Sequence, residues 1–284
     1  MTRCFFVSDL HGHIDRYRKL FHAVAREKPK AVFIGGDFLP FGFSPNYGAL
    51  LDFVTGYLPN ELAQLRASMG DDFPRVFLIM GNDDIRAAEP AVQELERHGL
   101  LEYIHDRKCV LGQFAVYGYA YVPPTPFSLK DWERYDISRF IDPGDISPEE
   151  GSRSVPLPER DKKYSTIKDD LARLAGNEVM DKAVFLFHAP PYQTNLDRVA
   201  LDGTRVDGVP MDVHVGSIAV RRFIEIRQPL LTMHGHVHES ATLTGSWKDT
   251  IGRTHLFSAA HDGPELALVC FELENVRSVT RRLL

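Results

Sequence analysis

Five short apolar runs are each followed by residues that can bind metal ions, and this repeated layout constrains the fold more than any other feature. The runs occupy residues 4–7, 31–34, 76–80, 183–187 and 230–233. Continuous runs of β-branched and aromatic residues of this length are typical of strands that are buried on both faces. The sequence therefore predicts a sheet of buried strands with polar chemistry at the strand ends.

Helical patterns separate these runs. Between residues 14 and 24, the apolar residues recur at the spacing of one helical face. Alternating strands and helices indicate an α/β fold, in which ligands bind beyond the carboxyl ends of the strands. The residues that follow the five runs are therefore expected to converge. Further helices are predicted over residues 47–57, 61–69, 87–98, 166–175 and 217–227.

Two stretches depart from this alternation. Residues 113–122, which follow the short run at 109–112, predict a hairpin with antiparallel strands at an edge or in a second sheet. Residues 123–164 are rich in proline and charge and show no sustained period. A long irregular segment of this kind is typical of a functional lid or a disordered loop. We expect one domain over residues 1–284, with the excursion at about 123–164 as a candidate lid.

Charge and cysteine content narrow the choice of partners and compartment. The 33 Lys and Arg residues against 39 Asp and Glu residues give a net charge of -6, which disfavours long nucleic acid as a partner. The three cysteines are scattered in apolar runs and are expected to be buried reduced thiols. No apolar run approaches the length of a membrane span, so we expect a soluble cytoplasmic protein without a membrane partner. The sequence does not indicate the oligomeric state.

The residues at the strand ends suit a catalytic metal site. Carboxylates, imidazoles and an amide oxygen bind Mn, Fe or Zn, and the set contains no cysteine of the kind that closed structural zinc sites use. Two divalent ions a few ångströms apart also need a bridging carboxylate and open positions for substrate and water. The set comprises Asp9, His11, Asp37, Asn82, His188, His236 and His238.

The order of these motifs, D-x-H, G-D, G-N-x-D, H and G-H-x-H, resembles that of the calcineurin-like metallophosphoesterase superfamily, and the motifs span residues 9–238. The resemblance implies a four-layer α/β/β/α sandwich with two mixed β-sheets and a dinuclear metal centre. It implies that Asp9, His11 and His238 bind one ion and that Asp37 bridges both. The ligands of the other ion would be Asn82, His188 and His236.

The same resemblance implies the reaction. A hydroxide that bridges the two ions would attack phosphorus in line, while the ions stabilise the developing charge. The expected cofactors are two divalent ions, with Mn²⁺ first and Fe, Zn or Ni as alternatives. The expected substrate is a phosphorylated small molecule, and the expected catalytic residues are Asn82, Asp83 and His188.

Asp83 departs from the family pattern. The third motif commonly runs G-N-H-[D/E], where the histidine helps to protonate the leaving group, whereas this sequence reads Gly81-Asn82-Asp83-Asp84. A carboxylate beside two cations stays charged and is a poor proton donor. It also repels a substrate anion by roughly 1 kcal/mol at about 4 Å in water. We therefore predict a preference for phosphodiesters; the alternative is that Asp83 only orients a water molecule or a neighbouring side chain.

Other residues have weaker claims to the site. The segment after His188 offers Tyr192, Thr194 and His214 as candidate substrate-binding residues. A rigid turn is the alternative interpretation of Tyr192 and Thr194. Several aromatic residues are expected to pack in the core, with the lining of a substrate pocket as the alternative: Phe38, Phe41, Phe43, Trp132 and Tyr135.

Two competing interpretations stay open at this point. An amidohydrolase-like barrel accounts for His11-x-His13 at the first strand end, but it does not explain Asp37 or the Gly-Asn-Asp cluster. A noncatalytic scaffold that binds a partner protein accounts for the replacement at Asp83. All expected metal ligands are nevertheless present, which favours an enzyme.

Overall fold

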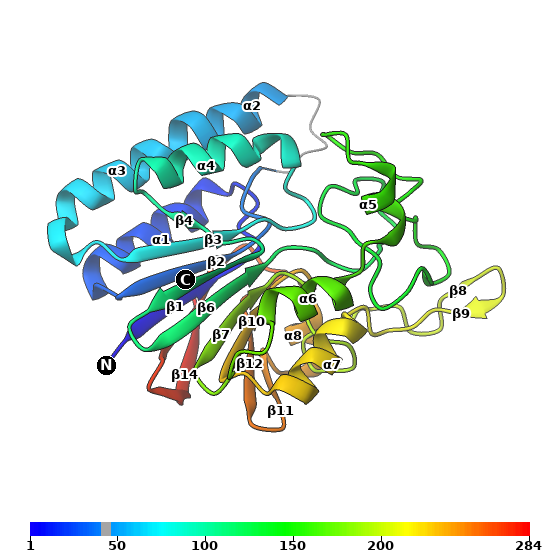
Figure 1. Ribbon diagram of the computed structural model, residues 1–284. Coiled ribbons are helices and arrows are strands. Elements are labelled where there is room, and N and C mark those ends of the chain that lie inside the picture. The colour runs from blue at the N-terminus through cyan, green and yellow to red at the C-terminus, as the bar shows by residue number, and fades with distance from the viewer. Residues whose placement is uncertain (41–46) are drawn as a thin grey trace.

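The computed structural model describes residues 1–40 and 47–284, and most of its strands form two mixed sheets of six strands (Figure 1). A separate antiparallel pair consists of β8 (Arg205–Val206) and β9 (Val209–Pro210). In the first sheet the order is β14-β13-β1-β2-β3-β4, and β1 to β4 run parallel. The two C-terminal strands extend this sheet in antiparallel fashion beside β1. The bounds are β1 (Arg3–Val7), β2 (Ala31–Gly35), β3 (Arg75–Ile79), β4 (Glu102–Tyr103), β13 (Ala267–Glu272) and β14 (Asn275–Leu283).

The second sheet has the order β11-β12-β10-β7-β6-β5. Its four central strands are parallel, and each edge strand is antiparallel to its neighbour. The predicted hairpin is present, with its two strands at β5 and β6 on the edge of this sheet. The bounds are β5 (Arg107–Leu111), β6 (Phe114–Tyr119), β7 (Ala183–Phe187), β10 (Leu231–His234), β11 (Lys248–Ile251) and β12 (Thr254–Ser258).

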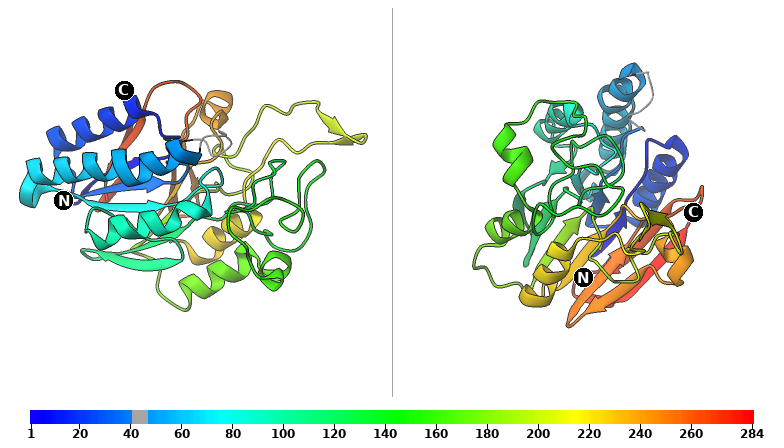
Figure 2. Two further views of the ribbon diagram at one scale, coloured as in Figure 1. Left: turned by 90° about the horizontal axis from the view of Figure 1, so that it is seen from above. Right: turned by 90° about the vertical axis from the view of Figure 1, so that its right-hand side faces the viewer.

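Helices cover the outer faces of both sheets (Figures 1 and 2). The first sheet carries α1 (Ile14–Glu27), α3 (Leu58–Met69) and α4 (Glu89–Arg97), and the second carries α6 (Ile167–Ala175) and α7 (Ile218–Arg227). Aromatic side chains join the inner faces, where the ring centroids of Phe257 and Phe271 lie 5.7 Å apart. The predicted four-layer α/β/β/α sandwich is confirmed. The amidohydrolase-like barrel is excluded, because the strands form two separate sheets.

One predicted helix boundary is wrong. The sequence predicts separate helices over residues 47–57 and 61–69, but α2 (Tyr47–Asp52), the π-helical turn Phe53–Tyr57 and α3 follow one another without a break. Pro59 lies in the first turn of α3. A proline removes one backbone hydrogen bond from a continuous helix, and the π-helical turn directly before α3 lies where that hydrogen bond is lost.

The candidate aromatic residues pack in the core wherever the structure describes them. Phe38 and Trp132 are fully buried and Tyr135 is 3% exposed. Phe41 and Phe43 lie outside the described residues. Of the cysteines, Cys4 and Cys270 are buried as predicted. Cys109 is partly exposed, contrary to expectation, because β5 is an edge strand.

The excursion at residues 123–164 packs against the rest of the chain and ends in α5 (Glu159–Tyr164). In Figure 1 it is drawn in green on the side where β1, β2 and β3 end. Lys130 and Glu133 form an ion pair within it, and neither side chain is exposed. Movement of the excursion as a lid stays a prediction. Among the described residues, no helix is long and apolar enough to cross a membrane.

Candidate metal centre

Three ligand-type side chains from two sheets form the first group. The potential ligand atoms of Asp9, His11 and His238 all lie within 4.8 Å of one another. His238 Nε2 lies 3.3 Å from both Asp9 Oδ1 and His11 Nε2. Asp9 Oδ2 is buried and accepts no hydrogen bond from any residue that the structure describes. A cation fits this group, since it would bind the buried oxygen and both imidazoles.

A second group lies next to the first. The potential ligand atoms of Asp37, His188 and His236 are also within 4.8 Å of one another. His188 Nε2 lies 3.1 Å from Asp37 Oδ2 and 3.0 Å from Asn82 Oδ1, while its Nδ1 lies 2.7 Å from the carbonyl oxygen of Gly35. A proton on Nδ1 donated to that carbonyl leaves the Nε2 lone pair directed at the centre, as metal binding requires.

Asp37 and His11 also form a third group with Asp83. Asp37 belongs to the second and third groups and His11 to the first and third, so the three groups are contiguous. The Asp83 amide donates to Asp37 Oδ1 at 2.8 Å, and the Asp83 carboxylate accepts from Asn82 Nδ2 at 2.9 Å. Asp83 thus lies against the candidate metal ligands.

Several of the candidate metal ligands have strained backbone conformations, and these set the direction of their side chains. Asp9, His11, Asp37 and His236 have φ values of 55°, 47°, 48° and 73°, in the left-handed region that residues with a Cβ rarely adopt. Such strain costs about 1–3 kcal/mol per residue and is found mostly at functional sites. The strand-end loops therefore hold these side chains at the candidate site in strained backbone conformations.

Glycines in the motifs leave room for the ligands. A Cβ on Gly81 would lie 2.2 Å from Asp37 Oδ1. A Cβ on Gly235 would lie 2.0 Å from Ser8 Oγ and 2.6 Å from Asp9 Oδ2. Any side chain at either position would displace a candidate ligand, which explains the Gly-Asn and Gly-His pairs in the sequence.

Residues 2–240 match the family model described as calcineurin-like phosphoesterase. The chain belongs to this family. No curated protein sequence matches it.

A solved structure from Thermus thermophilus has a similar fold. The chain is similar to the protein TT1561 of Thermus thermophilus, at 15% identity and a TM-score of 0.56, with 99% of this chain and 98% of that one covered. More distant matches are a novel archaeal phosphodiesterase (9% identity, TM-score 0.43, coverage 99% and 99%) and the E. coli phosphoesterase Yfce (11%, 0.37, 99% and 98%).

The candidate centre of this phosphoesterase brings carboxylates and histidines close together, and this proximity shifts their pKa values. Burial opposes charge on His188 and His238, yet the neighbouring carboxylates Asp37 and Asp9 raise the pKa of His188 to about 10 and that of His238 to about 9. Burial and the Asp37 carboxylate raise the pKa of Asp83 to about 7. Bound dications would reverse this last effect, because they favour the carboxylate form.

The candidate substrate-binding residues lie in the loop that follows His188. Tyr192 donates its hydroxyl hydrogen to Asp212 Oδ2 at 2.5 Å, and His214 Nδ1 lies 2.9 Å from Asp197 Oδ1. Thr194 is buried, and its hydroxyl donates to the Pro191 carbonyl oxygen at 2.9 Å. The Thr194 side chain therefore stabilises the turn, which is the alternative interpretation of this residue.

Two residues support the ligands from behind: sequence reasoning missed Arg16, whereas Asp84 matches the acidic residue of the family's third motif. Arg16 donates from Nη1 to the Asp9 carbonyl oxygen at 2.7 Å and from Nη2 to the Gly263 carbonyl oxygen at 2.5 Å. The only available signal was a charged residue close to the D-x-H motif. Asp84 accepts from the amides of Leu39 and Gly81, each at 2.9 Å, and so fixes the loops that carry Asp37 and Asn82.

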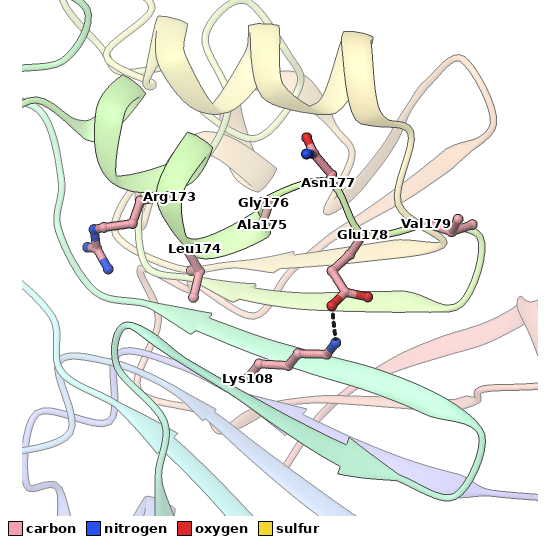
Figure 3. Close-up of a pocket in the computed structure, with 8 residues that line it drawn as sticks. All are labelled: Lys108, Arg173, Leu174, Ala175, Gly176, Asn177, Glu178 and Val179. Carbon is pink, nitrogen blue, oxygen red and sulfur yellow. Dashed lines mark ion pairs between the residues drawn. The ribbon is translucent and has the colours of Figure 1, made fainter.

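An open depression elsewhere on the surface is separate from this centre. Figure 3 shows it between α6 and β5, lined by Lys108 and residues 173–179, with Lys108 paired to Glu178 at 3.0 Å. It contains none of the candidate ligands.

Proposed function

We propose that this protein hydrolyses phosphoesters with two divalent metal ions and prefers phosphodiesters. The observation that supports this most directly is the set of three contiguous ligand groups, which are linked through His11 and Asp37. In the proposal Asp9, His11 and His238 hold one ion and Asp37 bridges to the other. The remaining ligands of the second ion are Asn82, His188 and His236.

The ligand set does not select a single metal ion, so the identity of the metal has to be measured. Carboxylate, imidazole and amide oxygen ligands suit Mn²⁺, and they also accept Fe, Zn or Ni. When bound, the two ions supply Lewis-acid charge for the phosphoryl oxygens and lower the pKa of water. The proposed substrate is a phosphorylated small molecule, and the proposed compartment is the cytoplasm.

We attribute the proposed preference for phosphodiesters to three carboxylates that lie close together at the candidate centre. Asp37 and Asp83 lie in one group, with Asp9 in the adjacent group. Each ionised carboxylate that does not neutralise a metal ion repels the substrate. A phosphomonoester dianion carries one more unit of negative charge than a diester monoanion, and it is therefore penalised more.

His214 is the residue that we propose for the leaving-group side. Asp197 is fully buried, and its carboxylate accepts from the amides of Gln193 and Thr194 as well as from His214 Nδ1. This arrangement fixes the ring tautomer with a hydrogen on Nδ1, and none of the residues that the structure describes forms a hydrogen bond with Nε2. The loop is anchored near His188, because the Ser217 amide donates to the Pro190 carbonyl oxygen at 2.8 Å.

The decisive experiment compares turnover of bis(p-nitrophenyl) phosphate and p-nitrophenyl phosphate by metal-stripped protein after Mn²⁺ is added. Diester turnover that is lost in Asn82→Ala supports the proposed centre and the role of Asp83. A monoester preference would refute the diester proposal while leaving the metal centre in place. Bound Mn²⁺ with no turnover of either compound would favour the noncatalytic scaffold.

A second experiment addresses His214. His214→Asn should slow diesters with alkyl leaving groups far more than those with p-nitrophenolate, which leaves without a proton. Equal losses for both leaving groups would exclude His214 as the proton donor.

A further inference from the structure

The excursion contains two carboxylates, one fully buried and one partly buried, that hold the loops behind the second candidate metal site. The first is Asp131, which is fully buried. Its Oδ2 accepts from the Arg86 amide at 2.8 Å, and its Oδ1 accepts from the Ser154 amide at 2.9 Å. The Ser154 hydroxyl donates to Asp131 and accepts from the Ala87 amide at 2.9 Å. Asp131 and Ser154 thus hold the backbone that directly continues the Asn82 loop.

The second carboxylate is Asp136, five positions later in the chain. Its Oδ1 accepts from the Ser217 hydroxyl at 2.5 Å and its Oδ2 from the Ile218 amide at 2.7 Å, at the start of α7. Ser217 is in turn paired with the segment that follows His188. Its amide donates to the Pro190 carbonyl oxygen at 2.8 Å, and its carbonyl oxygen accepts from the Tyr192 amide at 3.0 Å.

The segment between these two carboxylates is fixed on both sides. The Val122 amide donates to the Trp132 carbonyl oxygen at 2.9 Å, and the Ile167 amide donates to the Tyr135 carbonyl oxygen at 2.8 Å. The Trp132 ring is fully buried, with the Arg86 guanidinium 4.3 Å from its centroid. Ordering a segment of this kind costs conformational entropy, which the buried contacts offset.

The two carboxylates therefore connect to two ligands of the same candidate ion. On the side of the first sheet, Asp131 accepts from the Arg86 amide, and Arg86 follows Asn82 closely in the chain. On the side of the second sheet, Asp136 accepts from the Ser217 hydroxyl. The Ser217 amide in turn donates to the carbonyl oxygen of Pro190, which follows His188 closely in the chain. The Asn82 oxygen and His188 Nε2 are 3.0 Å apart.

The first group is supported from a different direction. The Asp9 carbonyl oxygen accepts from Arg16 of α1 at 2.7 Å, and Asp9 Oδ1 accepts from the His236 amide at 3.0 Å. Both donors lie outside the excursion. Support from residues 131–136 is therefore directed at the second site.

We propose that residues 131–136 form a fixed brace, in which Asp131 and Asp136 are positioning residues that set the separation of Asn82 and His188. The brace selectively supports the Asn82, His188 and His236 site. This inference rests on the proposed two-metal function. It assigns this part of the excursion a static role, in contrast to a moving lid.

The test uses Asp131→Asn and Asp136→Asn in the full chain, with Mn²⁺ as the probe. Each variant keeps the size of the side chain but replaces one acceptor oxygen with a donor that faces an amide or hydroxyl hydrogen. Loss of a residue that orients a ligand typically weakens metal binding about 10–100-fold. We expect one Mn²⁺ binding step to weaken by this factor, and the other step to keep its wild-type affinity.

Reference variants identify the weakened step. Asn82→Ala marks loss of the second site and His238→Ala marks loss of the first. The Mn²⁺ binding step that keeps its affinity in the Asp131→Asn and Asp136→Asn variants should have the same affinity as the step that remains in Asn82→Ala. Glu150→Gln is the matched control, because Glu150 lies exposed in the same excursion and should leave both steps unchanged. Backbone hydrogen exchange in the metal-free variants should increase at residues 82–87 for Asp131→Asn, and at Tyr192 and Ser217 for Asp136→Asn, because the amides of these two residues join Ser217 to the segment after His188.

Three outcomes separate the possibilities. Selective weakening of the second site supports the brace. Equal weakening of both sites, or unchanged Mn²⁺ binding together with lower thermal stability, would overturn it, because the segment would then be only a structural support. Failure of the wild-type protein to bind two Mn²⁺ ions would instead refute the proposed function itself.

Discussion

His188 Nε2 lies 3.0 Å from the side-chain oxygen of Asn82, although the two residues follow strands of different sheets. His188 follows β7 of the second sheet and Asn82 follows β3 of the first. The second candidate site therefore depends on how the sheets pack against each other as well as on its own residues.

His188 should be indispensable for turnover. His188→Ala is expected to lower kcat/KM for bis(p-nitrophenyl) phosphate by more than about 100-fold, since even the loss of an outer partner of a metal ligand costs about 10–100-fold. His22→Ala is a suitable control because His22 is exposed on α1. Steady-state kinetics at saturating Mn²⁺ measure the effect. Near-normal activity of His188→Ala would mean that the second ion is not needed.

Asp83 should set the choice between monoesters and diesters. Asp83→Asn removes one negative charge, and at about 4 Å this changes the interaction with each substrate charge by roughly 1 kcal/mol in water. We expect kcat/KM for p-nitrophenyl phosphate to increase about 5-fold relative to that for the diester. The ratio of the two kcat/KM values is the measurement. An unchanged ratio would support the alternative, in which Asp83 only orients a neighbour.

Stability and metal binding should respond to pH in opposite directions. The pKa values of His238 and His188 are raised to about 9 and 10 in the metal-free protein, where neighbouring carboxylates outweigh burial. A group with a raised folded-state pKa stabilises the fold fully below its unfolded pKa of about 6.5, and this contribution is lost as pH rises through the folded pKa. Metal ions compete with protons for the same nitrogens, so their affinity increases with pH.

The expected result is a falling Tm of the metal-stripped protein between about pH 7 and about pH 8.5, together with a growing Mn²⁺-induced increase in Tm. Thermal unfolding with and without Mn²⁺ measures both trends. The double variant His188→Ala and His238→Ala should flatten the first trend. A Tm of the stripped wild-type protein that increases over this range would contradict the assignment.

The buried ion pair in the excursion should matter for stability. Lys130 and Glu133 have no exposed side-chain surface, and burial lowers the pKa of Lys130 and raises that of Glu133. Lys130→Met leaves the carboxylate without its partner and should cost about 3–5 kcal/mol in the free energy of unfolding.

A matched control exists for this pair. Adding Glu133→Gln to Lys130→Met should recover part of the loss, because the uncompensated charge is removed. Lys162 pairs with Glu159 at the same i,i+3 spacing, but Glu159 is 85% exposed. Lys162→Met should therefore cost much less. Urea denaturation measures all of these variants, and equal losses at Lys130 and Lys162 would refute the role of burial.

Some errors of sequence interpretation have clear physical causes. Cys109 has apolar neighbours in the sequence but lies on an edge strand, and strand order is not encoded in local composition. Thr194 stays a candidate substrate-binding residue, and its hydroxyl donates within the turn, as the alternative interpretation expects. Asp131 and Asp136 showed no signal, because a carboxylate that accepts backbone hydrogen bonds cannot be distinguished in a charged loop from a solvated one until its partners are known.

The sequence by itself determined the strands, most helices and the candidate ligands, because apolar runs and Gly-Asp, Gly-Asn and Gly-His pairs are local patterns. Only the tertiary structure decided which ligands meet. Asn82 and His188 are 106 positions apart, and their contact depends on the packing of two sheets. The role of residues 131–136 is likewise tertiary, since hydrogen bonds between distant segments exist only after the chain has folded.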